Sequence, residues 1–326
     1  MSPMRLDGLN HITAITGDAP RNVDFYTGVL GLRLVTKTVN QDDPTVYHLF
    51  YADEDGDPGS DITFFEYPGA ARGRVGPGSA YRVVWRVGSA DALAFWGDRL
   101  AELAVDREVR ADSVVFADPE GLEHELRVEN VPDAPLRARH PEIPPEHGLL
   151  GFAGVRAYSM RPPYSRAMLV ELLGAEPRGE TTFELRGERR GAWITWDEAP
   201  GTRLLQGAGS IHHVAWGTTA AEHPLWFEHV AAAGVQTTPI IDRHFFHSIY
   251  FREPGGVLYE IADDAPGFTV FAPLAALGRR VELPPWLEPR RAQIEAVLTP
   301  LPDPRANWPA DDGAAGADSI ETGQAR

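Results

Sequence analysis

Four segments of this 326-residue chain repeat one order of elements, and that repeat constrains the fold more than any other feature. Each segment opens with a β-rich run, continues through an amphipathic helix and ends in several strands. The openings lie at 11–15, 81–87, 154–158 and 212–216, and the helices at about 21–30, 90–103, 165–173 and 221–233. We therefore predict an α+β fold of four βαβββ modules, which pair into two cup-shaped mixed β-sheets with helices packed outside.

Composition between the modules sets the predicted domain limits. Residues 131–149 are rich in Pro, Arg and His, which indicates a linker. Modules one and two then make a predicted N-terminal domain over 1–130, and modules three and four a C-terminal domain over 150–299. The tail at 300–326 is rich in Pro, Asp, Ala and Gly and is predicted to be disordered.

Charge and residue content exclude several classes of function. A formal net charge of −17 argues against nucleic acid and anionic membranes as partners, because both need clustered Lys and Arg. The chain has no Cys, which removes disulfides, thiolate nucleophiles and Cys-type zinc sites. No run is apolar enough for a membrane span and no leader opens the chain, so we expect a cytoplasmic protein. A homo-oligomer is one candidate for its assembly state.

Two imidazoles and one carboxylate stand out as candidate metal ligands. Aligning the first strands of the modules puts four residues at one position: His11, Arg82, Gly154 and His213. Aligning the last strands puts three carboxylates at another: Glu66, Glu125 and Glu260. Because only modules one and four offer imidazole, His11 and His213 can meet only if these two modules share a cup. The other two modules would then form a metal-free cup.

The set His11, His213 and Glu260 can cover one face of an octahedral ion and leave three positions open. That arrangement suits Fe(II) and dioxygen chemistry, and Mn(II) is a second ion that such ligands accept. His212 precedes His213 on a strand, so their side chains are predicted to point in different directions. This leaves His212 as a neighbour of the ligands or a contact of the substrate. His244 and His247 stay undecided, and four histidines are predicted to be solvated: His140, His147, His223 and His229.

Two stretches of sequence resemble a known family. The first comprises 9–13, 25–35, 37–44 and 47–49, and the second runs from Asp242 to Ala262. They are similar to the vicinal oxygen chelate superfamily, which includes glyoxalases, bleomycin-resistance proteins and extradiol dioxygenases. Within it, the chain resembles the dioxygenases that cleave the ring of hydroquinones. The resemblance covers modules one and four in sequence, and the middle of the chain in architecture alone.

This resemblance implies a site and a reaction. It implies Fe(II) held by His11, His213 and Glu260, and catalytic or substrate-contacting roles for four more residues: Thr13, His212, Arg243 and Tyr250. The implied substrates are O2 and a dihydroxylated aromatic, of the hydroquinone or the catechol type. The family can carry a further His just before the first ligand, where this chain has Asn10. Asn cannot shuttle a proton near neutral pH, so the proton path can differ here.

Side-chain chemistry suggests a role for three of these four residues. Arg243 is expected to stabilise the phenolate, His212 to act as general acid–base, and Tyr250 to orient the substrate. The alternative interpretation of Arg243 and Tyr250 is a structural salt bridge and a core ring. Two rival functions stay open: a glyoxalase-type isomerase or lyase in which Glu66 is a fourth ligand, and a non-catalytic resistance protein that binds aromatic ligands.

Overall fold

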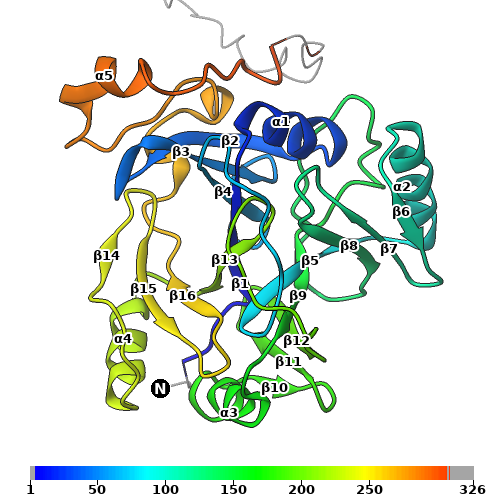
Figure 1. Ribbon diagram of the computed structural model, residues 1–326, viewed down its shortest axis with the longest axis vertical. Coiled ribbons are helices and arrows are strands. Elements are labelled where there is room, and N and C mark those ends of the chain that lie inside the picture. The colour runs from blue at the N-terminus through cyan, green and yellow to red at the C-terminus, as the bar shows by residue number, and fades with distance from the viewer. Residues whose placement is uncertain (1–3, 307, 309–326) are drawn as a thin grey trace, which may run out of the picture.

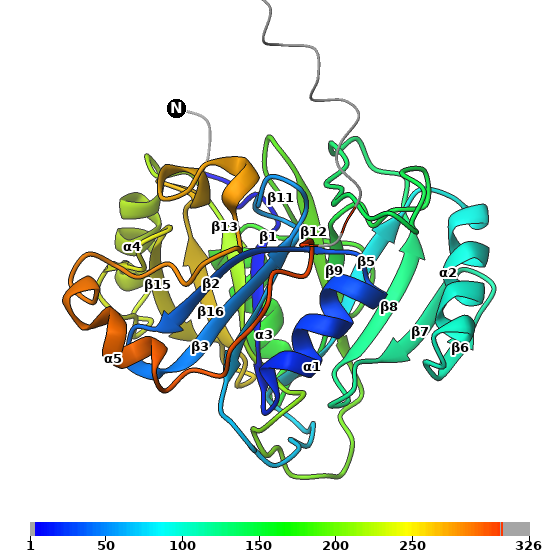
Figure 2. The ribbon, with the colours of Figure 1, turned by 90° about the horizontal axis from the view of Figure 1, so that it is seen from above.

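The computed structural model of the protein describes residues 4–306 and 308. Most of the tail predicted at 300–326, namely 307 and 309–326, lies outside the described residues. The strands form two mixed sheets of eight strands each (Figure 1). The helices lie around the periphery of the sheets in Figure 1, and the view from above shows a helix at each of two opposite ends of the molecule (Figure 2). The predicted α+β fold of four βαβββ modules in two cup-shaped sheets is confirmed.

The first sheet joins modules one and four in the order β14-β15-β16-β13-β1-β4-β3-β2. Strand β1 pairs antiparallel with β13 and parallel with β4, so the two modules meet along β1 and β13. This confirms the prediction that modules one and four share a cup. The strands of this sheet are β1 (Leu9–Thr16), β2 (Arg33–Asn40), β3 (Asp43–Ala52), β4 (Asp61–Glu66), β13 (Ile211–Gly217), β14 (Ile241–Asp242), β15 (His247–Arg252) and β16 (Leu258–Ala262).

The second sheet joins modules two and three in the order β10-β11-β12-β9-β5-β8-β7-β6. Its central pair, β5 and β9, is antiparallel like β1 and β13. Each sheet therefore contains strands from both of the domains predicted at 1–130 and 150–299. The strands are β5 (Ser79–Val87), β6 (Arg107–Val109), β7 (Ser113–Ala117), β8 (Glu123–Val128), β9 (Phe152–Tyr158), β10 (Glu176–Pro177), β11 (Thr182–Arg186) and β12 (Gly191–Asp197).

One helix follows the first strand of each module. Asp18 caps the first helix, because its Oδ1 accepts the N–H of Arg21 at 3.1 Å. The helices are α1 (Ala19–Val23) with a π-helical continuation (Asp24–Val29), α2 (Ala90–Glu102), α3 (Pro162–Ala167) with its continuation (Met168–Leu172), α4 (His223–Ala232) and α5 (Arg291–Glu295). Single 3-10 turns lie at Phe268–Val270, Leu274–Ala276 and Glu288–Arg290. Within the described residues, none of the helices has the length and apolar content that crossing a bilayer requires.

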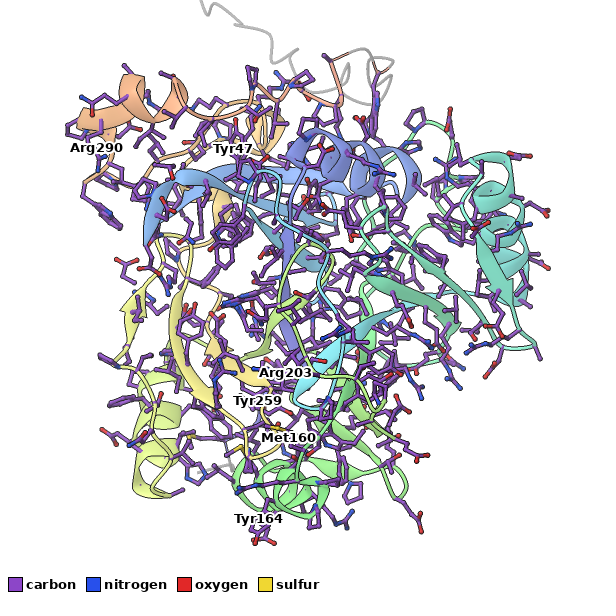
Figure 3. The ribbon with its side chains drawn as sticks, viewed as in Figure 1. Tyr47, Met160, Tyr164, Arg203, Tyr259 and Arg290 are labelled. Atoms are coloured by element: carbon purple, nitrogen blue, oxygen red, sulfur yellow. The ribbon has the colours of Figure 1, made fainter. Side chains whose placement is uncertain are left out.

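Aromatic and aliphatic side chains between the helices and the sheets make the core. Tyr259 on β16 is fully buried in it, whereas Tyr164 projects from α3 and is 64% exposed (Figure 3). His223 is also buried, at 1% exposure, and its Nε2 lies 3.0 Å from the carbonyl oxygen of Ile261. The prediction that His223 is solvated is therefore wrong. As the first residue of α4, it faces the sheet that the helix packs against.

Candidate metal centre

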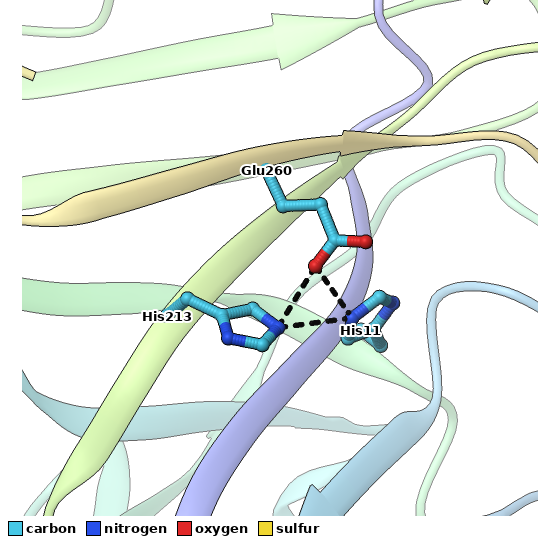
Figure 4. Close-up of side chains that lie close together, drawn as sticks. All are labelled: His11, His213 and Glu260. Carbon is cyan, nitrogen blue, oxygen red and sulfur yellow. Dashed lines mark hydrogen bonds and ion pairs between the residues drawn. The ribbon is translucent and has the colours of Figure 1, made fainter. Parts of the chain in front are cut away.

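Three side chains from three adjacent strands converge on one point in the first sheet (Figure 4). His11 on β1, His213 on β13 and Glu260 on β16 are each at most 3% exposed. The two Nε2 atoms lie 3.3 Å apart, and Glu260 Oε2 lies 3.1 Å from His11 Nε2 and 2.8 Å from His213 Nε2. Across residues 4–306 and 308, no other His, Asp or Glu side chains form a cluster of three that could hold an ion.

The spacing of these donor atoms fits a metal ion with open positions. Donors at right angles around an ion, with bonds of about 2.1 Å as at zinc, lie about 3.0 Å apart. Donors at tetrahedral angles would lie about 3.4 Å apart. The three observed separations, 2.8, 3.1 and 3.3 Å, fit the right-angled set better. Residues His11, His213 and Glu260 could therefore hold one face of an octahedral ion.

A β-bulge precedes each of the two histidines. Between the pairs Leu9–Trp216 and His11–Ala215, β1 advances by two residues and β13 by one, so Asn10 is the extra residue. A bulge lets consecutive side chains leave strict alternation, and here Asn10 Oδ1 lies 2.9 Å from His11 Nδ1. If His11 binds an ion through Nε2, its Nδ1 carries the proton and donates a hydrogen bond to Asn10 Oδ1. Asn10 thus orients the ring rather than shuttling protons.

The second bulge lies at His212. Between the pairs Thr13–His213 and Ala14–Ile211, β13 advances by two residues and β1 by one. As a result His212 and His213 border the same cavity, with their Nδ1 atoms 2.8 Å apart. The prediction that they point in different directions is wrong, because it assumed an unbroken strand. His213 Nδ1 would donate to His212 Nδ1, just as His11 donates to Asn10.

Charge on the three candidate ligands is set by their mutual contact. Burial alone would raise the pKa of Glu260, but His11 and His213 hold that pKa well below its usual range. Burial opposes protonation of His11, yet Glu260 raises its pKa above the ordinary value. Burial lowers the pKa of His213. Ser248 donates a hydrogen bond to Glu260 Oε1, so Oε2 faces the histidines in a fixed direction.

A cavity of about 400 Å³ opens beside the three side chains. Aromatic rings make much of its wall, namely those of Phe50, Phe65, Phe245, Phe246 and Tyr250. The ring centroid of Phe246 lies 5.0 Å from that of His11. Such an apolar, flat-sided space with a few polar groups is suited to an aromatic ligand.

Arg243 and Tyr250 lie together at this cavity. Arg243 Nε donates to Tyr250 Oη at 3.2 Å, and the Tyr250 ring centroid lies 5.6 Å from that of His213. Burial raises the pKa of Tyr250, so its hydroxyl keeps its proton. Arg243 also pairs with Asp42 at 3.3 Å, but Asp42 is 78% exposed and this pair is weak. The guanidinium is therefore available to a ligand in the cavity.

Other predicted residues lie elsewhere. Thr13 is fully buried outside the cavity wall, with its Oγ1 2.7 Å from Thr63 Oγ1. His244 packs on Phe271, with ring centroids 3.7 Å apart, and His247 Nδ1 lies 3.0 Å from Asp263 Oδ2. Neither His244 nor His247 borders the cavity.

Glu66 does not join the candidate ligands. Its Oε1 accepts the N–H of Ala19 at the start of α1, at 3.1 Å. The strand registers show which residue is the counterpart of Glu260. Glu260 pairs with the residue two beyond His213, and Thr63 pairs with the residue two beyond His11. Thr63 therefore takes that place in module one, and the alignment that put Glu66 there was wrong by three residues.

His48 is a cavity residue for which we predicted no role from the sequence. It borders the cavity from β3, and burial lowers its pKa well below the ordinary value, so the ring is neutral. The available signal was alternation: Tyr47, Leu49 and Tyr51 enter the main core, so His48 falls on the opposite face of β3.

Comparisons with known proteins agree with this geometry. A family model described as the Glyoxalase/Bleomycin resistance protein/Dioxygenase superfamily matches residues 8–126 and 147–261. MhqO of Bacillus subtilis, named as a candidate ring-cleaving dioxygenase, is 39% identical over 90% of this chain and 96% of its own. MhqA of the same organism, named likewise, is 37% identical over 91% of this chain and all of its own. A chlorohydroquinone/hydroquinone 1,2-dioxygenase of Sphingobium indicum is 32% identical over 88% of this chain and 94% of its own.

Solved structures extend the comparison. The crystal structure of a candidate dioxygenase from Bacillus subtilis has a TM-score of 0.85 and 37% identity, over 92% of this chain and 98% of its own. Glyoxalase I from Zea mays has a TM-score of 0.53 at 15% identity, over 79% of this chain and 92% of its own. The second likeness concerns the fold alone.

Proposed function

The chain belongs to the Glyoxalase/Bleomycin resistance protein/Dioxygenase superfamily, and we propose that it is an Fe(II)-dependent dioxygenase that cleaves the ring of a dihydroxylated aromatic. The observation that carries this proposal is the set of three donors, two imidazoles and one carboxylate, that opens onto an aromatic-walled cavity. The names of relatives at 32–39% identity support it. Hydroquinones are the first substrate candidates and catechols the second.

His11, His213 and Glu260 would hold the ion, and three donors leave positions for a diol and for dioxygen. The ion would supply the electron transfer between ring and dioxygen that neither performs readily alone, and Mn(II) is the second candidate. The protein contributes position. His11, His213 and Glu260, called here the triad, would fix one end of the substrate through the ion, and the aromatic wall holds the ring flat.

Arg243 and Tyr250 act on the charge of the bound diol. Arg243 stays charged at any working pH, so it stabilises a phenolate oxygen or the negative charge that develops during cleavage. Tyr250 keeps its proton and receives a hydrogen bond from Arg243, so its own O–H can donate to a ligand. Together they orient the ring toward the triad.

His212 works as a neutral group. Burial lowers its pKa to about 3, so it does not store an extra proton near neutrality. With its Nδ1 accepting from His213, its Nε2 carries the proton. We therefore assign His212 the role of a hydrogen-bond donor through Nε2. It can pass the Nε2 proton to a ligand only if the ring receives a second proton in exchange. Thr13 contributes indirectly, by holding Thr63 in place.

The rival functions fit these residues less well. A glyoxalase-type centre with a fourth protein ligand would need a carboxylate in module one, but Glu66 binds the backbone of α1 and Thr63 occupies the matching position. A resistance protein that only binds aromatic ligands has no need of the three converging donors.

Anaerobic reconstitution with Fe(II), followed by oxygen-uptake measurements, tests the proposal. The protein is loaded with Fe(II), its metal content is verified, and a panel of hydroquinones and catechols is supplied with air. We expect stoichiometric consumption of O2 with at least one diol and a ring-opened product. A fully loaded protein that consumes no O2 with any diol would refute the assignment.

A further inference from the structure

One wall of the cavity carries polar groups that the proposed reaction does not use. This wall, called here the β3 wall, consists of Thr38 on β2, His48 and Phe50 on β3, and Phe65 on β4. The His48 ring lies between two aromatic rings, with centroids 4.1 Å from Phe50 and 4.3 Å from Phe65. Because the ring is held on both sides, its two nitrogens keep fixed directions.

One nitrogen of His48 is engaged and the other is not. Its Nε2 lies 3.0 Å from Thr63 Oγ1, which in turn lies 2.7 Å from Thr13 Oγ1. Its Nδ1 has no hydrogen-bond partner in the described part of the chain. A neutral imidazole has one donor and one acceptor nitrogen, so Nδ1 can still make one hydrogen bond to a ligand.

Thr38 lies directly opposite His48, because the two are Cα partners in the β2–β3 pair. Its side chain is 3% exposed, and among residues 4–306 and 308 its Oγ1 has no hydrogen-bond partner. Buried hydroxyls are nearly always paired, since an unpaired one costs stability. Two neighbouring polar groups on one cavity wall thus have unused hydrogen-bonding capacity.

The distance from Thr38 and His48 to the triad decides which diols could contact both. In the order β13-β1-β4-β3-β2, His48 is two strands away from His11. At about 4.8 Å per strand this is about 10 Å along the sheet, and the curvature of the cup shortens the path across the cavity. A para-diol is rigid and holds its two oxygens at opposite ends of the ring. An ortho-diol holds both at one end, where both would meet the ion.

We propose that Thr38 and His48 form a subsite that hydrogen-bonds the second hydroxyl of a para-diol, which makes the cavity selective for hydroquinones over catechols. This inference rests on the proposed function, because it assumes that the first oxygen binds at the triad. It gives a chemical reason for the unpaired hydroxyl of Thr38 and for the neutral ring between Phe50 and Phe65.

Anaerobic binding to the Fe(II)-loaded protein tests the subsite, with hydroquinone, phenol and catechol as probes. Phenol lacks the second hydroxyl and so does not report on the subsite. We expect Thr38→Val to weaken hydroquinone binding about fivefold, the equivalent of one hydrogen bond of about 1 kcal/mol, and to leave phenol and catechol unchanged. Thr218→Val is the matched control, because Thr218 also has a buried Oγ1 without a partner in the described chain but does not border the cavity.

Two substitutions of His48 test the roles of its two ring nitrogens separately. Gln can place an amide near the former Nε2 and keep the contact with Thr63, whereas Asn can place one near the former Nδ1. We expect the His48→Gln protein to bind hydroquinone no more tightly than phenol. The His48→Asn protein should retain most of the wild-type preference for hydroquinone.

Two results overturn the inference. If the wild-type protein cleaves hydroquinone but Thr38→Val and His48→Gln weaken hydroquinone and phenol equally or not at all, the subsite is absent and the proposed function stands. If the loaded wild-type protein neither binds nor cleaves any diol, the proposed function fails and the subsite fails with it.

Discussion

The two sheets share one backbone plan but differ in what stands at matching positions. The β5–β9 pair has the same two bulges as β1–β13, located here at Tyr81 and Ala153. Arg82 therefore takes the place of His11, and Gly154 the place of His213. The alignment of first strands made from the sequence is confirmed by these registers.

The second cup is filled by its own side chains. Arg82 donates to Glu123 at 2.7 Å and to Glu125 at 3.1 Å, so its charge is neutralised within the sheet. Gly154 leaves room for the indole of Trp193, since a Cβ on this glycine would lie 2.4 Å from Trp193 Cδ2. No imidazole and no open carboxylate remain at the matching positions. The fold thus supplies two equivalent positions, and the side chains decide which of them can hold an ion.

Removing a ligand should have the largest effect. His213→Ala, like His11→Ala, removes one of three donors, and we expect metal affinity and oxygen uptake to fall by more than about 100-fold, because even outer partners of a ligand cost 10–100-fold. Far-UV circular dichroism should stay unchanged. His229→Ala on the surface of α4 is the control. Full activity of the metal-verified His11→Ala or His213→Ala protein would contradict the ligand assignment.

Breaking the ion pairs of the second cup should affect stability but not metal binding. Arg82→Met leaves Glu125, which is 2% exposed, without its closest cation. We expect a loss of about 3 kcal/mol in the free energy of unfolding, at the low end for a broken buried pair because Glu123 is 41% exposed. Urea denaturation measures this loss. Reduced metal content in the folded variant would show that the two cups are coupled.

Asn10, the extra residue in the bulge of β1, is predicted to affect metal affinity through its contact with His11. Asn10→Ala removes the group that accepts from His11 Nδ1, so we expect metal affinity to fall about 10–100-fold. Asn10→Asp keeps an acceptor oxygen and should retain most of the affinity. Competition with a chelator measures both variants. Equal affinities for the Ala variant and the wild type would mean that Asn10 does not orient His11.

Metal binding should strengthen as the pH rises, and it should continue to strengthen above 6.5, the ordinary pKa of histidine, because the pKa of His11 is raised. Glu260 raises the pKa of His11 in the folded, metal-free protein. The protonated ring therefore contributes its full stability below the ordinary histidine pKa, and this contribution is lost as the pH rises through the raised pKa of His11. An ion binds only the deprotonated ring, so affinity gains up to about tenfold per pH unit until His11 is deprotonated. Titration of metal affinity against pH checks the sign. A flat profile would indicate that His11 is already neutral.

The sequence predicted the modular fold well because module order and hydrophobic periodicity are local properties. It also predicted the pairing of modules one and four, from the fact that only they carry imidazole at the first-strand position. The assignment of Glu66 failed because a carboxylate near a strand end was aligned without knowing the register. Only the strand pairing shows that Thr63 stands opposite Glu260 in the pseudo-symmetry of the cup.

One of the bulges explains the error at His212 and His213. Alternation of side chains predicts opposite directions for His212 and His213, and a single extra residue cancels that rule. Nothing in the local sequence marks the bulge. His48 was missed for a different reason. Its proposed role depends on its neighbours Thr38 on β2 and Thr63 on β4, which lie on other strands.

The order of residues along the chain establishes which groups are available for chemistry. These are two histidines and a glutamate, in modules whose fold can bring them together. Tertiary structure alone decided how they meet, because the positions of their donor atoms depend on strand register, on two bulges and on packing between segments about 200 residues apart. Those contacts follow from the cooperative burial of both sheets, which no local pattern encodes.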